Sequence, residues 1–106
     1  MFRKLYVFRY GGEEFLILFT RTGIEGVTMA AEKIRMACES EEYSYNEHKI
    51  HVTVSIGIVS VNRLFQVQVA DIIGFADKAL YQAKKDGRNC VRAYIEQSVY
   101  PKELKI

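Results

Sequence analysis

The sequence has few of the features that mark secreted or membrane proteins. Its only cysteines, Cys38 and Cys90, form neither a C-x-x-C pair nor a disulfide framework. Free thiols in a reducing cytoplasm are the simplest interpretation, so we expect a cytoplasmic location. The longest unbroken apolar run in the first half is Phe15–Phe19, far shorter than a membrane span, so no membrane segment is expected. The basic start is not followed by a signal-peptide pattern, because Arg9 interrupts the apolar segment and no small-residue cleavage site follows.

Charge of one sign is also scarce. The 15 basic and 13 acidic residues leave a formal net charge of +2, which is too small to suggest a protein that binds nucleic acid polymers. Neither a basic stripe nor an aromatic ribonucleoprotein-type motif supports an unrelated ferredoxin-like domain that binds RNA or a small molecule. Hydrophobic residues make up 49% of the chain and charged residues 26%, a globular mix, and 106 residues suffice for one domain.

The most informative stretch is Arg9-Tyr10-Gly11-Gly12-Glu13-Glu14-Phe15, which separates two apolar runs, Leu5–Phe8 and Phe15–Phe19. Two central residues between strand-like runs predict a tight β-hairpin, and Gly-Gly suits a type I′ turn, which needs positive φ at both positions. The second run is apolar at every residue, so we expect a strand covered on both faces. Gly11 and Gly12 lack a Cβ, so a ligand can approach the backbone closely there. The sequence therefore predicts a hairpin of residues 5–10 and 14–19 with two carboxylates at its tip.

Two stretches with apolar residues at three- and four-residue spacing predict helices. The first is expected over about residues 23–40, where Thr22 and Glu25 match a capping box at its start. The second carries an apolar stripe from Val69 to Ala83. It is expected to end at Gly87, a residue suited to the left-handed position after a helix.

Between these helices, alternating hydrophobicity predicts a long strand. The even-numbered residues from Ile50 to Ile58 are all aliphatic and β-branched, so we expect one strand with that face in the core. The opposite face includes the small residues Ser55 and Gly57, which leave room for close packing or a neighbouring ligand. Residues 41–49 are predicted to form a loop or a short edge strand, and residues 89–94 a final strand.

The expected order of elements is strand, strand, helix, strand, helix, strand. This order favours an α+β fold in which helices pack on an antiparallel sheet. We expect residues 1–95 to form the domain. Residues 96–106, with Pro101 and the charged residues around it, are expected to form a solvated C-terminal tail.

Three segments in the correct order carry a family resemblance. Gly11–Phe15 matches the signature Gly-Gly-(Asp/Glu)-Glu-Phe, and Val52–Ile58 and Ala76–Asn89 match later parts of the same pattern. The chain thus resembles the GGDEF family of diguanylate cyclases, which join two GTP molecules into cyclic di-GMP. An ordinary hairpin with exposed glutamates would explain the turn but not the later segments. The resemblance implies a core like that of nucleotide cyclases and polymerase palms, which is ferredoxin-like.

The resemblance also implies a metal site at the hairpin tip. A polyphosphate with divalent cations needs hard oxygen ligands, which carboxylates supply, so Mg²⁺ or Mn²⁺ is the expected cofactor. The third residue of the signature ligates the metal and helps to activate the attacking hydroxyl in the family, and that residue is Glu13 here. Glu14 belongs to the same site. Because adjacent strand residues point to opposite faces, Glu13 is the stronger catalytic candidate, and a solvated turn carboxylate is the alternative for either residue.

The same resemblance assigns the substrate contacts. Gly11 and Gly12 lie at the expected GTP site, and Lys84 and Arg88 match the family's basic pair that holds the triphosphate. Two cations at a helix end can neutralise phosphate oxygens, and Arg can do so with two hydrogen bonds. The alternative for Lys84 and Arg88 is a solvated helix terminus, where cations are favourable without any ligand.

The family domain begins upstream of its signature, with a first strand that carries another metal-binding Asp and residues that read guanine. This chain contains none of that part, so we expect a partial domain, truncated at the N-terminus and inactive by itself. Catalysis would need the complete, homodimeric parent, because each family domain holds one GTP. An N-terminal sensory or receiver domain is expected in that parent. The alternative is a degenerate module that binds nucleotide or a protein partner for signalling without catalysis.

Overall fold

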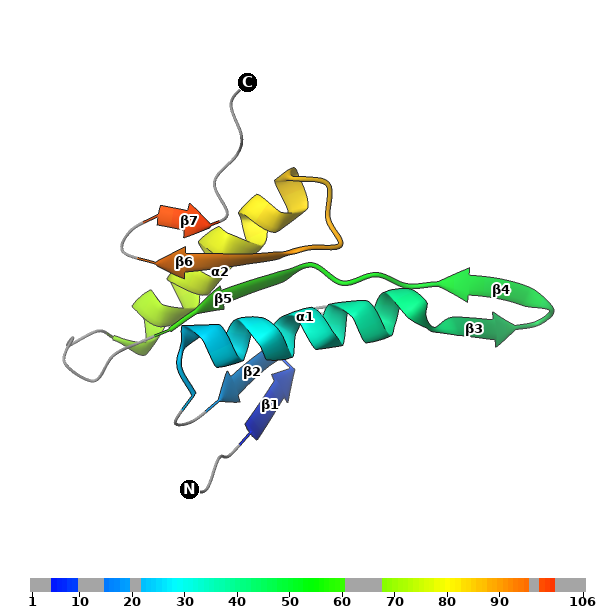
Figure 1. Ribbon diagram of the computed structural model, residues 1–106, viewed down its shortest axis with the longest axis horizontal. Coiled ribbons are helices and arrows are strands. Elements are labelled where there is room, and N and C mark those ends of the chain that lie inside the picture. Colours follow the sequence, from blue (N-terminus) through cyan, green and yellow to red (C-terminus); the bar gives the residue numbers. More distant parts are fainter. Residues whose placement is uncertain (1–4, 10–14, 20–21, 61–67, 96–97, 101–106) are drawn as a thin grey trace.

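A computed structural model describes residues 5–9, 15–19, 22–60, 68–95 and 98–100. The α+β class predicted from the order of elements is confirmed (Figure 1). Within the described residues, no helix is both long and apolar enough to cross a membrane. The elements are β1 (Leu5–Arg9), β2 (Phe15–Phe19), α1 (Ile24–Ser40), β3 (Glu42–Tyr45), β4 (His48–His51), β5 (Ile56–Val59), α2 (Val69–Lys85), β6 (Val91–Ile95) and β7 (Ser98–Tyr100).

The centre of the fold is a strand, helix, strand unit formed by β5, α2 and β6. β5 and β6 pair in parallel, from Ile56 opposite Val91 to Val59 opposite Tyr94. The sequence predicted an antiparallel sheet here, and the difference arises because α2 is a crossover that returns the chain to the end of the sheet where β5 began. β7, which was not predicted, pairs antiparallel with β6 and completes a sheet with the order β5-β6-β7.

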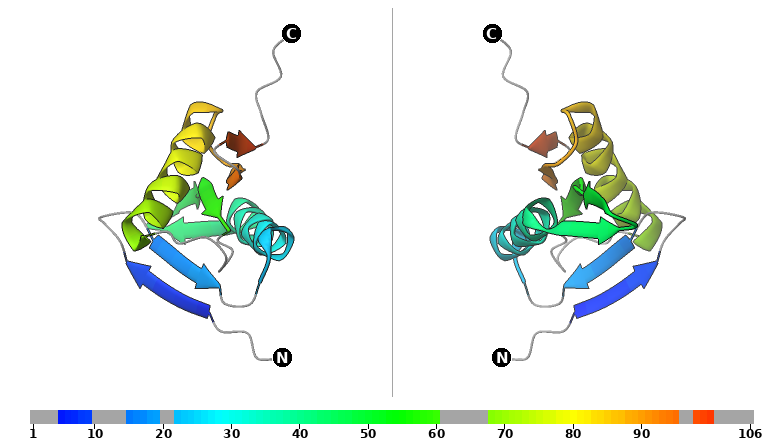
Figure 2. Two further views of the ribbon diagram at one scale, coloured as in Figure 1. Left: turned by 90° about the vertical axis from the view of Figure 1, so that its left-hand side faces the viewer. Right: turned by 90° about the vertical axis from the view of Figure 1, so that its right-hand side faces the viewer.

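The two helices cover opposite faces of this sheet (Figure 2). On the α1 side, Ala31 packs with Ile58 and Ala93, and all three side chains are at most 7% exposed. On the α2 side, Phe75 stacks on Tyr94 with ring centroids 4.6 Å apart. Successive strand residues point to opposite faces of the sheet. In β5, Ile56 and Ile58 therefore face α1, whereas Gly57 faces α2.

Gly57 brings α2 and β5 unusually close together. A Cβ built on Gly57 would lie 2.3 Å from both the Ala76 carbonyl oxygen and the Leu80 backbone nitrogen. These are backbone atoms within a helix, so they cannot move aside as a flexible side chain would. The sequence predicted that the small residues on this face allow close packing or a ligand. At Gly57 the structure shows close packing.

The predicted single strand over residues 50–58 is wrong. Ile50 belongs to β4 and is 42% exposed, residues 52–55 are not in a strand, and only Ile56–Val59 joins the central sheet. β4 instead pairs with β3 in an exposed hairpin that projects from the body (Figure 1). Tyr45 lies opposite His48, and the two residues between them, Asn46 and Glu47, have φ of 47° and 67°. These positive angles at both central residues are those of a type I′ turn.

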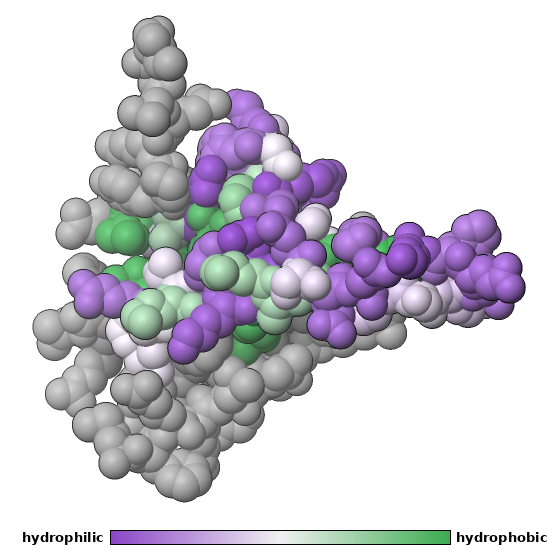
Figure 3. Space-filling model, turned by 45° about the vertical axis from the view of Figure 1, so that its right-hand side comes forward, coloured by the Kyte–Doolittle hydropathy of each residue, from purple (hydrophilic) through white to green (hydrophobic). Residues whose placement is uncertain are grey.

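The surface of this hairpin explains why alternation alone was misleading there. All residues of β3 and β4 are exposed, and the projecting part is largely hydrophilic (Figure 3). Lys49 and His51 lie 3.4 Å and 3.8 Å from the carboxylate of Glu42 on the paired strand. Strand alternation therefore continues through residues that lie outside the core, and the period of the pattern does not reveal where the chain leaves the central sheet.

The first hairpin is confirmed as an antiparallel pair, in which Leu5 lies opposite Phe19 and Arg9 lies opposite Phe15. The residues of the predicted turn, Gly11 and Gly12, lie outside the described residues, so the type I′ turn stays a prediction. β1 and β2 form a separate two-stranded sheet, and Ile17 is 37% exposed. The expectation that β2 is covered on both faces is thus not met at Ile17.

The helices have nearly the predicted bounds, and their ends differ in how they are capped. α1 was expected to start with a capping box of Thr22 and Glu25, but Gly23 is the N-cap residue and no side-chain capping hydrogen bond is formed there. Asp86 is the C-cap of α2 and Gly87 follows it with φ of 109°, which confirms the predicted glycine stop.

Candidate functional site

The end of α2 carries the two predicted cations and an uncommon backbone conformation. Gly87, Arg88 and Asn89 have φ of 109°, 64° and 47°, so three consecutive residues are left-handed. This conformation suits glycine, but it costs other residues about 1–2 kcal/mol each because of Cβ crowding. The strain at Arg88 must be offset by contacts that hold the turn, whereas Asn89 tolerates the left-handed conformation more easily.

Backbone hydrogen bonds tie this turn to α2 and β5. The Arg88 N–H donates to the Ala83 carbonyl over 2.9 Å, which satisfies a carbonyl of the last helical turn. The Asn89 N–H donates to the Ser55 hydroxyl over 3.1 Å, just before β5 begins. The Ile56 N–H then donates to the Cys90 carbonyl over 3.0 Å. The turn is thus fixed on both sides of Arg88.

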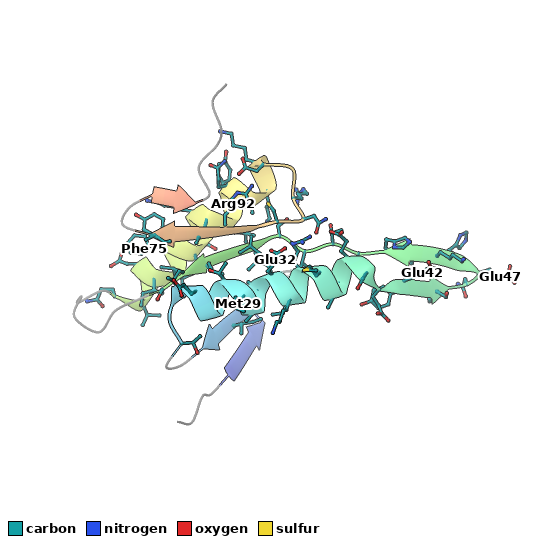
Figure 4. All side chains as sticks on the ribbon, viewed as in Figure 1. Met29, Glu32, Glu42, Glu47, Phe75 and Arg92 are labelled. Carbon is teal, nitrogen blue, oxygen red and sulfur yellow. The ribbon has the colours of Figure 1, made fainter. Side chains whose placement is uncertain are left out.

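Side chains of α1 hold the same turn from another direction. Arg35 Nη1 donates to Asn89 Oδ1 over 3.0 Å and to Glu39 Oε2 over 2.8 Å. Asn89 Nδ2 also donates to Glu39 Oε2, and Arg35 Nε donates to Glu32 Oε1 over 2.8 Å. Glu32 is labelled on α1 in Figure 4. We call Arg35, Glu39 and Asn89 the α1–turn network, with Glu32 as its outer partner.

The charges in this network stabilise one another. The hydrogen bond from Arg35 to Glu32 raises the pKa of the Arg35 guanidinium, helped by the negative charges of Glu32 and Glu39. The hydrogen bond from Asn89 lowers the pKa of the Glu39 carboxyl, and Arg35 lowers it further. Glu39 is therefore ionised in the neutral range, and a charged pair holds the amide of Asn89.

A second ion pair is formed by Asp86, the acidic residue at the end of α2. Arg92 Nε donates to Asp86 Oδ2 over 2.8 Å, and Gln82 Nε2 donates to Asp86 Oδ1 over 2.7 Å. Arg92 lies on β6 (Figure 4). The hydrogen bond from Arg92 is the main reason that the pKa of Asp86 is lowered, and the bond from Gln82 adds to it. The negative charge of Asp86 is thus balanced by the positive charge of Arg92.

Asp86 is expected to make the fold sensitive to acid. Its carboxyl has a lower pKa in the folded chain than its unfolded value of about 3.9, so its contribution to stability is present above that pH. The contribution is lost as the pH falls through the folded pKa. We expect the melting temperature to fall as the pH drops below about 4, and to fall less in Asp86→Asn, when both are followed by circular dichroism. Asp77→Asn, an exposed change on the same helix, should behave as the wild type. An equally steep fall in Asp86→Asn would contradict the assignment.

The structure places the predicted basic pair at one end of α2. Lys84 lies in the last helical turn and is half-buried, whereas Arg88 is exposed in the turn that follows. The other predicted site residues, Gly11, Gly12, Glu13 and Glu14, lie outside the described residues. Their position relative to the end of α2 therefore stays a prediction.

The metal site also stays a prediction. In the described ranges, no three His, Cys, Asp or Glu side chains gather in an arrangement that could hold a metal ion. Glu39, which accepts a hydrogen bond from Asn89, already binds Arg35, and Asp86, the C-cap residue of α2, already binds Arg92. The expected ligand, Glu13, is outside the described part of the chain.

Sequence reasoning missed the α1–turn network. Arg35 and Glu39 read as the polar face of an amphipathic helix, yet the Arg35 side chain is only 16% exposed. Their i,i+4 spacing indicates an ion pair on the helix, but it gives no sign of a contact with Asn89, which is 50 residues beyond Glu39 in sequence. Within the motif Gly87-Arg88-Asn89, Asn tolerates the left-handed conformation, and this was the only available signal.

Comparison with known proteins identifies the family of the chain. The family model described as "Diguanylate cyclase, GGDEF domain" matches residues 1–90. The chain belongs to the GGDEF domain family. It is 44% identical over 84 residues to diguanylate cyclase A of Treponema denticola and 36% identical over 94 residues to diguanylate cyclase DgcZ of Escherichia coli. These matches cover 78% and 88% of the chain.

A solved structure supports the same fold for this GGDEF chain. The active GGEEF domain of a diguanylate cyclase from Vibrio cholerae matches with a TM-score of 0.72 and 30% identity, over 88% of the chain. The chain spans 58% of that solved chain, and 22% and 31% of the lengths of the Treponema denticola and Escherichia coli relatives. The GGDEF chain therefore corresponds to a part of these proteins.

Proposed function

We propose that this GGDEF chain is part of a diguanylate cyclase, which condenses two GTP molecules into cyclic di-GMP and pyrophosphate. Family membership supports the reaction, and the unaltered signature Gly-Gly-Glu-Glu-Phe at residues 11–15 supports a competent parent. Catalysis takes place in the complete, dimeric protein, because two GTP molecules must face each other across two domains. Residues 1–106 alone are inactive in this proposal.

The observation that carries the proposal is the cationic end of α2. Asp86 is bound to Arg92, so the carboxylate closest in sequence to Arg88 is already neutralised. Arg88 is exposed on a turn whose backbone is fixed by Ala83 and by Ser55 through Asn89. A guanidinium presented in this way can donate two parallel hydrogen bonds to phosphate oxygens, and Lys84 adds a second positive charge at the same helix end.

In the proposed mechanism, the residues of the chain bind and orient the triphosphate. Arg88 and Lys84 hold the phosphates that will leave as pyrophosphate, and their charge stabilises the negative charge that develops there. Gly11 and Gly12 allow the backbone to approach the substrate. Glu13 would hold Mg²⁺ or Mn²⁺, with Glu14 in the same site. When bound, the ion would polarise the α-phosphate and make the ribose 3′-hydroxyl more acidic.

The reaction is tested by incubating the complete protein with GTP and Mg²⁺ and measuring cyclic di-GMP and pyrophosphate. Formation of both products supports the proposal. Binding of GTP without turnover would instead support the alternative, a degenerate module that binds nucleotide or a protein partner for signalling. Absence of both binding and turnover would overturn the nucleotide function.

The role of Arg88 gives a sharper test. Arg88→Ala removes charge-assisted hydrogen bonds worth about 1.5–3 kcal/mol, so GTP binding should weaken about 10- to 100-fold. The dissociation constant of GTP can be measured by calorimetry on the complete protein. Lys85→Ala is the matched control, because it removes an exposed cation from the same helix end and should change GTP binding little. Equal effects of the two substitutions on GTP binding would show that the overall positive charge of this helix end, rather than specific hydrogen bonds from Arg88, determines the affinity.

A further inference from the structure

We propose that Arg35, Glu39 and Asn89 are positioning residues, which hold Arg88 in the orientation that binds the triphosphate. This inference rests on the proposed function, because it concerns how the phosphate-binding arginine is held. It adds a role for α1, an element that carries none of the residues assigned to the site from the family signature. The reasoning follows from the backbone of Arg88, the contacts of Asn89 and the packing of Arg35.

The direction of the Arg88 side chain depends on the backbone. Arg88 is exposed and has φ of 64°, a conformation that a residue other than Gly, Asn or Asp seldom adopts. A right-handed or extended backbone at this position would send the Cα–Cβ bond in a different direction. The left-handed state must therefore be maintained if the guanidinium is to remain where it can meet phosphate.

The residue after Arg88 is the point at which the conformation is held. The backbone of Asn89 is bound to Ser55, and its side-chain amide uses both ends, because Oδ1 accepts from Arg35 and Nδ2 donates to Glu39. These bonds connect Asn89 to α1 and to the segment before β5. Since the N–H of Arg88 is bound to Ala83, rotation of the Arg88 backbone would break contacts on one side or the other.

Arg35 is suited to act as the fixed end of the network. Its side chain is 16% exposed, and its guanidinium contacts Glu32 through Nε and Nη2 and Glu39 and Asn89 through Nη1. A planar group with four such contacts has little freedom to rotate. α1 itself is held by the core contact of Ala31 with Ile58 and Ala93. The core thus determines where Asn89, and through it Arg88, can lie.

A double-mutant cycle tests whether this network acts through Arg88. In the complete protein, Asn89→Ala should raise the dissociation constant of GTP about tenfold, because the guanidinium is no longer preoriented. In an Arg88→Ala background, the same change should have little further effect. A purely structural role for Asn89 predicts equal effects in both backgrounds. Additive effects, or unchanged GTP binding in Asn89→Ala, would overturn the inference.

A second variant keeps the test valid if Asn89→Ala folds poorly. Glu39→Ala removes an exposed carboxylate and should weaken GTP binding in the same direction, again only when Arg88 is present. Glu41→Ala, which removes an exposed acidic side chain just beyond the same helix, is the charge-matched control and should bind GTP as the wild type. If Arg88→Ala itself leaves GTP binding unchanged, the phosphate-binding role of Arg88 fails, and the positioning role fails with it. If Arg88→Ala weakens GTP binding but Asn89→Ala and Glu39→Ala leave it unchanged, the proposed function stands and this inference alone is wrong.

Discussion

Gly57→Ala is expected to destabilise the domain by about 3 kcal/mol or more, which is a large part of the stability of a small domain. The added methyl would lie 2.3 Å from two backbone atoms of α2, far inside van der Waals contact. α2 would have to move away from β5, and Phe75 would then be displaced from its stacked position on Tyr94. Urea unfolding followed by circular dichroism should show a much lower midpoint, or no folded baseline.

Gly74→Ala is the matched control for this experiment. Gly74 lies within the same helix, and a Cβ there would meet nothing within 4 Å. Because alanine favours the helix over glycine, the substitution should stabilise the domain by about 0.5–1 kcal/mol. The same chemical change at two glycines should thus have opposite signs. A wild-type midpoint for Gly57→Ala would show that α2 does not pack on β5 at this distance.

The sequence predicted the helices well and the long strand poorly, for a physical reason. A helix is bound by hydrogen bonds within itself, so the spacing of apolar residues and Gly87 was enough to locate α2 and its end. A strand is defined by its partner. The alternation over residues 50–58 is the same whether β4 and β5 form one strand or two. A two-residue period does not identify the partner strand, so it could not show that β4 pairs with β3 and β5 with β6.

Turn residues showed a similar limit. The type I′ turn expected at Gly11 and Gly12 lies outside the described residues, whereas the two-residue turn at Asn46 and Glu47 was not predicted. Asn46 favours the left-handed conformation, but Glu47 does not, so local preference gave only half of the signal. The pairing of β3 with β4 supplies the rest, since it fixes which residues are left between the strands.

In the candidate site, too, the sequence predicted the residues that are close together along the chain but not the contacts between segments that are far apart in sequence. Lys84, Gly87 and Arg88 lie within five consecutive positions, so the sequence could place them at one helix end. The contacts of Asn89 with Arg35 and Glu39 join segments 54 and 50 residues apart. They depend on α1 packing against the central sheet, and this packing follows from the core rather than from any spacing near the turn.

Glu13→Gln in the complete protein is expected to reduce cyclic di-GMP synthesis on the order of 10³-fold, given that a metal ion contributes several kcal/mol of transition-state stabilisation and each 1.36 kcal/mol is tenfold. The amide keeps the size of the carboxylate but loses the charge that a divalent cation requires. The decrease should appear in kcat rather than in the melting temperature. Product formation from GTP and Mg²⁺ provides the measurement, with Mn²⁺ as a second metal.

Two comparisons decide what a loss of activity in Glu13→Gln means. Glu47→Gln makes the same chemical change at an exposed turn of the second hairpin, so it should leave synthesis unchanged. Glu14→Gln should lose less activity than Glu13→Gln, because side chains of adjacent strand residues point to opposite faces and only one can be directed fully at the metal. If Glu13→Gln retains full turnover while Glu14→Gln does not, the metal-binding role belongs to Glu14. If both retain it, the hairpin carboxylates take no part in the reaction, and the basic end of α2 would serve nucleotide binding alone.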